Sequence, residues 1–171
     1  MYGKNTCTMK NLFIVIAILS CSLAYGQDSE NNKITIDPRS YTLGNIGAFG
    51  EMVSLGIKKL ALSAPLEPEE MNELIDEARN VAKRNNVEIF REKEFLVTDL
   101  FPQSVTNGKH VLLIYTGNTK EKYLALKNKK AELIESGQYK GIARKEIARK
   151  FGRMLSYPES KINELINENK S

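Results

Sequence analysis

Residues 67–85 carry the clearest helical pattern in the chain, and a short apolar segment stands on each side of them. Apolar side chains recur on one helix face at Met71, Leu74, Ile75, Ala78 and Ala82. The flanking segments, 57–63 and 87–90, have the composition of strands. A strand–helix–strand connection of this length favours parallel pairing with a right-handed crossover. We therefore expect an α/β fold that contains a parallel βαβ unit.

Two more strands and three more helices are predicted after this unit. Residues 95–100 are a strand candidate, and residues 110–115 form the most apolar strand, which should be central. Helical patterns cover about 120–136 and 141–155, and Pro158 starts a last helix. The expected architecture is a single small domain with a sheet of three or four strands and a helical C-terminal third.

The N-terminus has the features of an export signal. Residues 12–20 are an apolar run that follows Lys10 and is too short to span a bilayer. A stretch of small residues ending at Gly26 follows, which predicts cleavage before Gln27. We interpret residues 1–26 as a signal peptide, and the expected location is the periplasm or the medium.

Two details at this end of the chain stay open. Met9 directly precedes the basic residue of the signal and is the more usual start, so residues 1–8 belong to a miscalled start in this interpretation. Cys21 ends a sequence that resembles a lipoprotein box, and the alternative is therefore a lipid-anchored protein of the outer membrane. Downstream, residues 27–40 are expected to be a flexible lead-in, and residues 41–171 the α/β domain.

Composition excludes several kinds of chemistry after cleavage. The only cysteines are Cys7 and Cys21, so the mature chain has none and no disulfide is expected. His110 is the one histidine, which argues against a zinc site, and we predict neither a metal nor a cofactor. No segment after the signal is long and apolar enough to predict a transmembrane span.

Charge is segregated along the chain. Residues 120–153 hold 11 basic and 4 acidic side chains, whereas residues 27–119 hold 10 basic and 14 acidic ones. Such a basic segment suggests an anionic partner, such as an anionic glycan, phosphate headgroups or an acidic protein. Nucleic acid is not expected for an exported protein. The alternative is a solvated helix face without a ligand.

Five residues are candidates for binding an anionic ligand. Lys145, Arg149 and Arg153 are spaced four residues apart and form one stripe on a helix. Tyr139 stands just before that helix. Thr119, predicted as an N-cap, follows the central strand, at a position where helix N-termini attract anions.

Candidates for catalysis are few. The chain shows no Ser/His/Asp order and no G-x-S-x-G sequence. Asp99, at the end of an expected strand, and His110 are the two candidates. The spacing of Gly44, Gly47 and Gly50 does not match a dinucleotide-binding loop and indicates tight packing or turns.

The export signal and the Asn-, Lys- and Ile-rich composition resemble those of exported proteins of the Bacteroidota. This resemblance implies polysaccharide utilisation as a context and names no family. The predicted function is an exported binding or accessory protein for an anionic polysaccharide, without catalysis. The alternative is a small carbohydrate-active enzyme that uses Asp99 or His110, and a cleft shared by these two residues would favour it.

Overall fold

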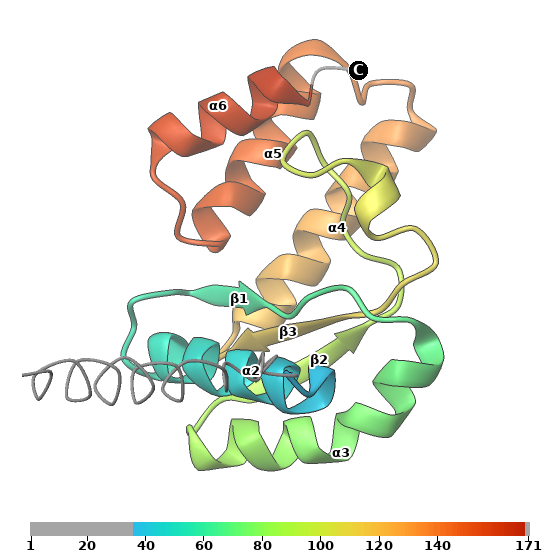
Figure 1. The fold of residues 1–171 in the computed structure, drawn as a ribbon. Coiled ribbons are helices and arrows are strands. Elements are labelled where there is room, and N and C mark those ends of the chain that lie inside the picture. The colour runs from blue at the N-terminus through green and yellow to red at the C-terminus, as the bar shows by residue number, and fades with distance from the viewer. Residues whose placement is uncertain (1–35, 170–171) are drawn as a thin grey trace, which may run out of the picture. The chain divides into compact units, whose positions relative to one another are not determined.

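The computed structural model describes residues 36–169. The predictions on the signal peptide, on cleavage between Gly26 and Gln27 and on lipidation of Cys21 lie outside the described residues. The elements in chain order are α2 (Pro38–Ser54), β1 (Leu60–Leu62), α3 (Pro68–Arg84), β2 (Glu88–Glu92), the 3-10 helix η1 (Gln103–Val105), β3 (Val111–Tyr115), α4 (Thr119–Glu135), α5 (Gly141–Met154) and α6 (Glu159–Glu168) (Figure 1).

The sheet has three strands in the order β1-β3-β2, and β3 is antiparallel to both of its neighbours. The predicted parallel βαβ unit is therefore wrong. Helix α3 does connect β1 to β2, but these two strands lie on opposite edges of β3 and do not pair. Ala61 of β1 and Ile89 of β2 are both in register with Ile114 of the central strand.

The burial of β3 explains this strand order. All five of its residues are buried, which is not true of β1 or β2. A strand buried on both faces is best placed where both of its edges are paired too. β1 is three residues long and β2 carries the charged residues Glu88, Arg91 and Glu92, and such strands suit the edges of a sheet. β3 is central, as predicted.

Residues 95–100 form no strand, so this predicted element is also wrong. Side chains of α4 satisfy backbone groups of the segment. The Leu96 N–H donates to Tyr123 Oη at 2.9 Å, and the Val97 carbonyl accepts from Lys130 Nζ at 2.8 Å. The segment thus packs against α4 and does not extend the sheet.

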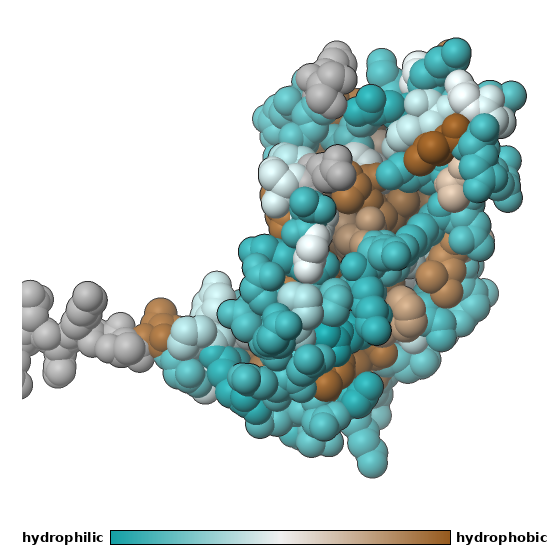
Figure 2. Space-filling view, turned by 90° about the vertical axis from the view of Figure 1, so that its right-hand side faces the viewer, coloured by the Kyte–Doolittle hydropathy of each residue, from teal (hydrophilic) through white to brown (hydrophobic). Residues whose placement is uncertain are grey.

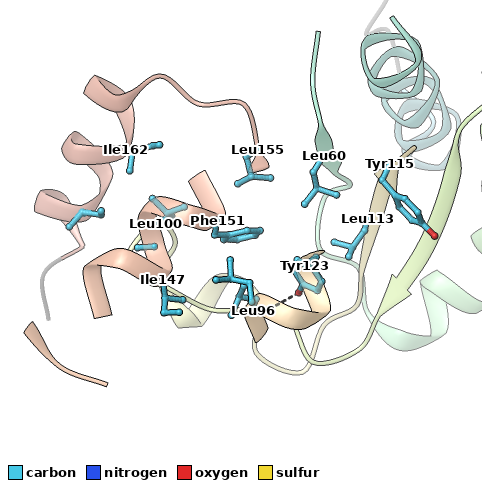
Figure 3. Packing of buried hydrophobic residues seen from close by; sticks show 13 residues of the cluster. Leu60, Leu96, Leu100, Leu113, Tyr115, Tyr123, Ile147, Phe151, Leu155 and Ile162 are labelled. Atoms are coloured by element: carbon cyan, nitrogen blue, oxygen red, sulfur yellow. Dashed lines mark hydrogen bonds between the residues drawn. The ribbon is translucent and has the colours of Figure 1, made fainter. Parts of the chain in front are cut away.

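The two faces of the sheet belong to two hydrophobic cores. Figure 1 shows α2 and α3 on one side of the sheet and α4, α5 and α6 on the other. Ala61 and Ile114 contribute to the core with α2 and α3, whereas Leu60 and Leu113 contribute to the core with the C-terminal helices. Figure 3 shows the second core, with Phe151 of α5 at its centre.

The predicted helices of the C-terminal third are present, and α3, α4 and α5 match their expected bounds to within one residue. The N-cap of α4 is Asn118 and not Thr119. Helix α2 begins at Pro38, inside the segment expected to be a lead-in, because the Asp37 carboxylate caps it by accepting from the Ser40 N–H at 2.9 Å.

The spacing of glycines in α2 reflects close packing against α3. A Cβ at Gly50 would lie 3.2 Å from the Cβ of Asn85, and a Cβ at Gly47 would lie 3.6 Å from Val81 Cγ1. Gly44 is different, because a Cβ there would meet nothing within 4 Å. Gly50 is therefore tightly packed, whereas Gly47 makes an ordinary contact and Gly44 makes none.

Candidate functional site

A cleft of about 620 Å³ lies between the irregular segment that follows β2 and the helices α4, α5 and α6. Figure 2 looks onto the right-hand side of Figure 1 and shows hydrophobic residues gathered in the upper half of this face, enclosed by hydrophilic ones. The cleft is lined by Val97, Thr98, Asp99, Phe101, Pro102, Lys130, Tyr139, Arg144, Glu168 and Asn169.

Asp99 and Arg144 form an ion pair at the wall of the cleft. Arg144 Nε and Nη2 lie 2.7 Å and 2.6 Å from the same carboxylate oxygen, Asp99 Oδ1. The Asp99 side chain is only 9% exposed, whereas that of Arg144 is 36% exposed. Donation of hydrogen bonds to the Asp99 carboxylate raises the pKa of the Arg144 guanidinium above its ordinary value.

Lys130 brings a second cation into the same cleft. Its Nζ donates to the Val97 carbonyl at 2.8 Å and lies 5.3 Å from the centre of the Tyr139 ring. Burial, and then the positive charge of Arg144, lower the pKa of the Lys130 ammonium. Burial, and then the charge of Asp99, raise the pKa of the Tyr139 hydroxyl.

This arrangement can accommodate an anion. An ammonium group has more N–H donors than the single hydrogen bond to Val97 uses. An anionic group next to Lys130 and Arg144 would offset both the burial of the lysine and the repulsion between the two cations. Glu168 of α6 also lines the cleft and is exposed, so an anion is favoured on the side of the cleft that holds the cations.

Of the predicted catalytic pair, only Asp99 lines the cleft. The backbone of His110 forms a β-bridge with Leu66. The His110 Nδ1 lies 3.1 Å from Arg91 Nε, and it is the acceptor of this hydrogen bond because an arginine can only donate. Burial, and then the positive charge of Arg91, lower the pKa of His110. His110 is not among the residues lining this cleft.

The predicted basic stripe on α5 is partly neutralised by neighbouring acids. Arg149 Nη1 lies 3.1 Å from Glu146 Oε1, and Arg153 Nε lies 2.5 Å from Glu159 Oε1. Lys145 is exposed on the same helix. The stripe lies on α5, but none of its three cations lines the cleft.

The remaining predicted ligand-binding residues, Tyr139 and Thr119, lie in different places. Tyr139 lines the cleft beside Lys130. Thr119 does not line it, and its hydroxyl donates to the Thr116 carbonyl at 2.9 Å, which closes the loop before α4.

Lys130 and Arg144 are the cations of the cleft, and neither was among the residues that the sequence predicted for a site. The sequence spacing could have identified both, because each lies on the same face of its helix as residues that are buried. Lys130 follows the buried Tyr123 by seven residues, and Arg144 precedes the buried Ile147 and Phe151 by three and seven. A cation on the buried face of a helix points toward the core, where it lines a cleft or pairs with a buried group.

Comparisons with protein-family models, with curated proteins and with solved structures found no match for this chain. Between residues 36 and 169, no helix combines the length and the apolar character that crossing a membrane requires. The same part of the chain holds no cluster of three or more His, Cys, Asp or Glu side chains suited to a metal ion.

Proposed function

We propose that the protein is an exported binding or accessory protein for an anionic polysaccharide, and that Lys130 and Arg144 bind a carboxylate or sulfate group of that ligand in the cleft. The observation that carries this proposal is the convergence of these two cations, from two different helices, on one cleft beside Tyr139. Asp99 orients the guanidinium of Arg144, and such an orientation favours specific recognition of an oxyanion.

The cleft is a better site than the stripe on α5. Two of the three stripe cations pair with acids of the chain, so an incoming ligand has to compete with Glu146 and Glu159, whereas the Lys130 ammonium of the cleft donates to the neutral Val97 carbonyl. Lys145 and Arg153 are also exposed, and exposed charges are screened by salt and contribute little to affinity. A partly buried cation in a concave site is screened less, and its hydrogen bonds to an anion are stronger.

A titration of acidic and neutral oligosaccharides against neighbouring lysine variants tests the proposal. Lys130→Gln removes a cation from the cleft, whereas Lys129→Gln removes an exposed cation of the same helix that pairs with Glu132. Charge-assisted hydrogen bonds contribute about 1.5–3 kcal/mol, so Lys130→Gln should weaken binding of the acidic ligand about tenfold or more. Lys129→Gln should leave the affinity unchanged.

The stripe provides the contrasting variant. Replacing Lys145, Arg149 and Arg153 together by Gln should leave the affinity for acidic oligosaccharides almost unchanged. If the triple variant loses binding while Lys130→Gln keeps it, the anion site is on the stripe and the assignment to the cleft is wrong. If no acidic oligosaccharide binds the wild type, the proposed function itself is wrong.

The export proposal has a separate test. Cleavage before Gln27 predicts one mass for the exported protein, and that mass can be measured directly. A diacylated N-terminus at Cys21 would replace the soluble periplasmic form by an outer-membrane lipoprotein. An uncleaved chain would contradict both.

A carbohydrate-active enzyme is the second candidate, and the placement of Asp99 at the cleft wall is the observation that favours it. Its expected partner, His110, does not line this cleft, and Oδ1 of Asp99 is engaged by Arg144. Turnover of a panel oligosaccharide by the wild type, abolished by Asp99→Asn, would establish catalysis. Binding without turnover supports the accessory role.

A further inference from the structure

Helix α2 presents an apolar stripe to solvent. Tyr41 is 60% exposed, Met52 41% and Leu55 67%, although all three are large hydrophobic residues. Gly44 and Ala48, which are also exposed, lie between them. At 3.6 residues per turn, these five residues fall on one face of the helix.

The opposite face of α2 is already used by the fold. Ile46, Gly50 and Val53 are buried there, and α2 packs against α3, β1 and β3. The helix is therefore apolar on two opposite sides, which is the pattern of a helix that is covered on both. Exposed apolar patches of this kind mark sites of protein association.

The stripe has a symmetry that indicates what covers it. Successive residues are separated by three, four, four and three positions, so the spacing reads the same from either end about Ala48. An antiparallel copy of α2 centred on Ala48 would therefore place Tyr41 opposite Leu55 of the second copy, and Gly44 opposite Met52 of the second copy. Each contact would occur twice, as a twofold interface requires.

Residue size along α2 fits the same arrangement. A Cβ at Gly44 would meet nothing within 4 Å, so the surface there is open to a large side chain such as methionine. Gly44 and Ala48 also allow two helix backbones to approach closely.

We propose that the outer face of α2 is an interface between two copies of this chain, paired antiparallel about a twofold axis at Ala48. The proposal is independent of the proposed anion site, because no residue of the apolar stripe on α2 lines that cleft.

Sedimentation of the full chain over a concentration series tests the association. The wild type should form a dimer, and Met52→Asp should be monomeric at every concentration, because a charge would be buried opposite Gly44. Ile142→Asp is the matched control, since Ile142 is 80% exposed at the start of α5 and lies outside the stripe. It should dimerise like the wild type. A monomeric wild type, or an equal loss in both variants, would overturn the proposal.

Cysteine cross-linking tests the register and direction, in a full chain whose Cys7 and Cys21 are replaced by Ser. Ala48→Cys should form a disulfide-linked dimer under mild oxidation, and a mixture of Tyr41→Cys and Leu55→Cys chains should form the mixed dimer. Ser54→Cys, exposed on α2 beside the stripe, should remain uncrosslinked. Stronger linking of Tyr41→Cys to itself than to Leu55→Cys would indicate parallel pairing and contradict the proposal.

Flotation with lipid vesicles separates the dimer from a membrane-binding face. A dimer that buries the stripe should not float with vesicles of anionic or neutral lipid. Flotation of the wild type that is lost in Met52→Asp, together with a monomeric state in solution, would assign the stripe to a lipid surface and overturn the dimer.

Discussion

Arg144 of α5 holds Asp99 of the irregular segment through two nitrogens that meet one carboxylate oxygen, at 2.7 Å and 2.6 Å. Asn169, at the end of α6, donates to the Leu100 carbonyl of the same segment at 3.3 Å. Side chains of the C-terminal helices thus fix the segment that forms one wall of the cleft. The cleft should therefore depend on these contacts for its stability as well as its shape.

Loss of the Arg144 side chain should destabilise the protein. Arg144→Met leaves the nearly buried Asp99 carboxylate without its guanidinium, and an unsatisfied group of this kind costs about 1–3 kcal/mol. Arg149→Met removes a more superficial pair with Glu146 and should cost about 0.5 kcal/mol or less. Denaturant unfolding of both variants measures the difference. Equal midpoints would show that the pair with Asp99 carries no stability.

Removing Lys127 alone should lower the free energy of unfolding more than removing Glu92 and Lys127 together. The Glu92 side chain is 5% exposed, its Oε1 accepts from Lys127 Nζ at 3.0 Å, and its Oε2 is buried without a hydrogen bond among the described residues. Lys127→Met should cost about 3–5 kcal/mol of unfolding free energy, because it leaves a buried carboxylate unpaired.

The double variant Glu92→Leu with Lys127→Met removes both charges and should recover most of that loss. Thermodynamic coupling in a double-mutant cycle measures the effect. A double variant that is less stable than Lys127→Met would contradict a net cost of burying this carboxylate.

Gly152 permits the close contact between α5 and α6. A Cβ at this position would lie 2.6 Å from Ile162 Cγ1, so Gly152→Ala should cost about 1–3 kcal/mol through overpacking. Gly47→Ala is the matched helical control, because its Cβ would lie at an ordinary 3.6 Å from Val81. Unfolding midpoints compare the two, and the cost of Gly152→Ala should shrink in an Ile162→Ala background. The same cost in both backgrounds would place the strain elsewhere.

His110 should make stability depend on pH. Burial and the charges of Arg91 and Lys93 lower its pKa in the folded chain below the ordinary 6.5, with Glu69 acting weakly in the opposite direction. As the pH falls through this ordinary value, the unfolded chain binds the proton first. The contribution to stability is therefore present above it and is lost below it.

His110→Gln should remove this dependence, because the Gln oxygen can accept from Arg91 but does not titrate. The unfolding free energy should fall more in the wild type than in the variant between about pH 7.5 and about pH 5.5. An identical fall in both proteins would exclude a role for His110.

The strand order illustrates what the sequence could and could not predict. The patterns identified β1, α3, β2 and β3, and they identified β3 as central. They did not show that β3 lies between β1 and β2, because a helical crossover of this length also joins strands that are separated by a third. The apolar residues of 95–100 were equally ambiguous, since Leu96 and Leu100 are buried by packing against helices and not in a sheet.

For the core and the cleft too, the sequence predicted the elements but not how they pack together. Leu113, in the strand expected to be central, is fully buried, whereas Ile75 on the apolar face of α3 is only partly buried and its neighbour Leu74 takes the inner position. Asp99 and Tyr139 were candidates for separate reasons, and nothing in their spacing showed that they line one cleft. That relationship follows from how α4 and α5 pack.

The most direct test of the account is a titration of the tightest acidic oligosaccharide at two salt concentrations, with the wild type, Lys130→Gln and Lys129→Gln. The account predicts that salt weakens binding by the wild type and by Lys129→Gln alike. It also predicts that Lys130→Gln binds more weakly at low salt and responds less to added salt. Wild-type affinity in Lys130→Gln, or equal binding of a neutral oligosaccharide of the same length, would contradict an anion site in this cleft.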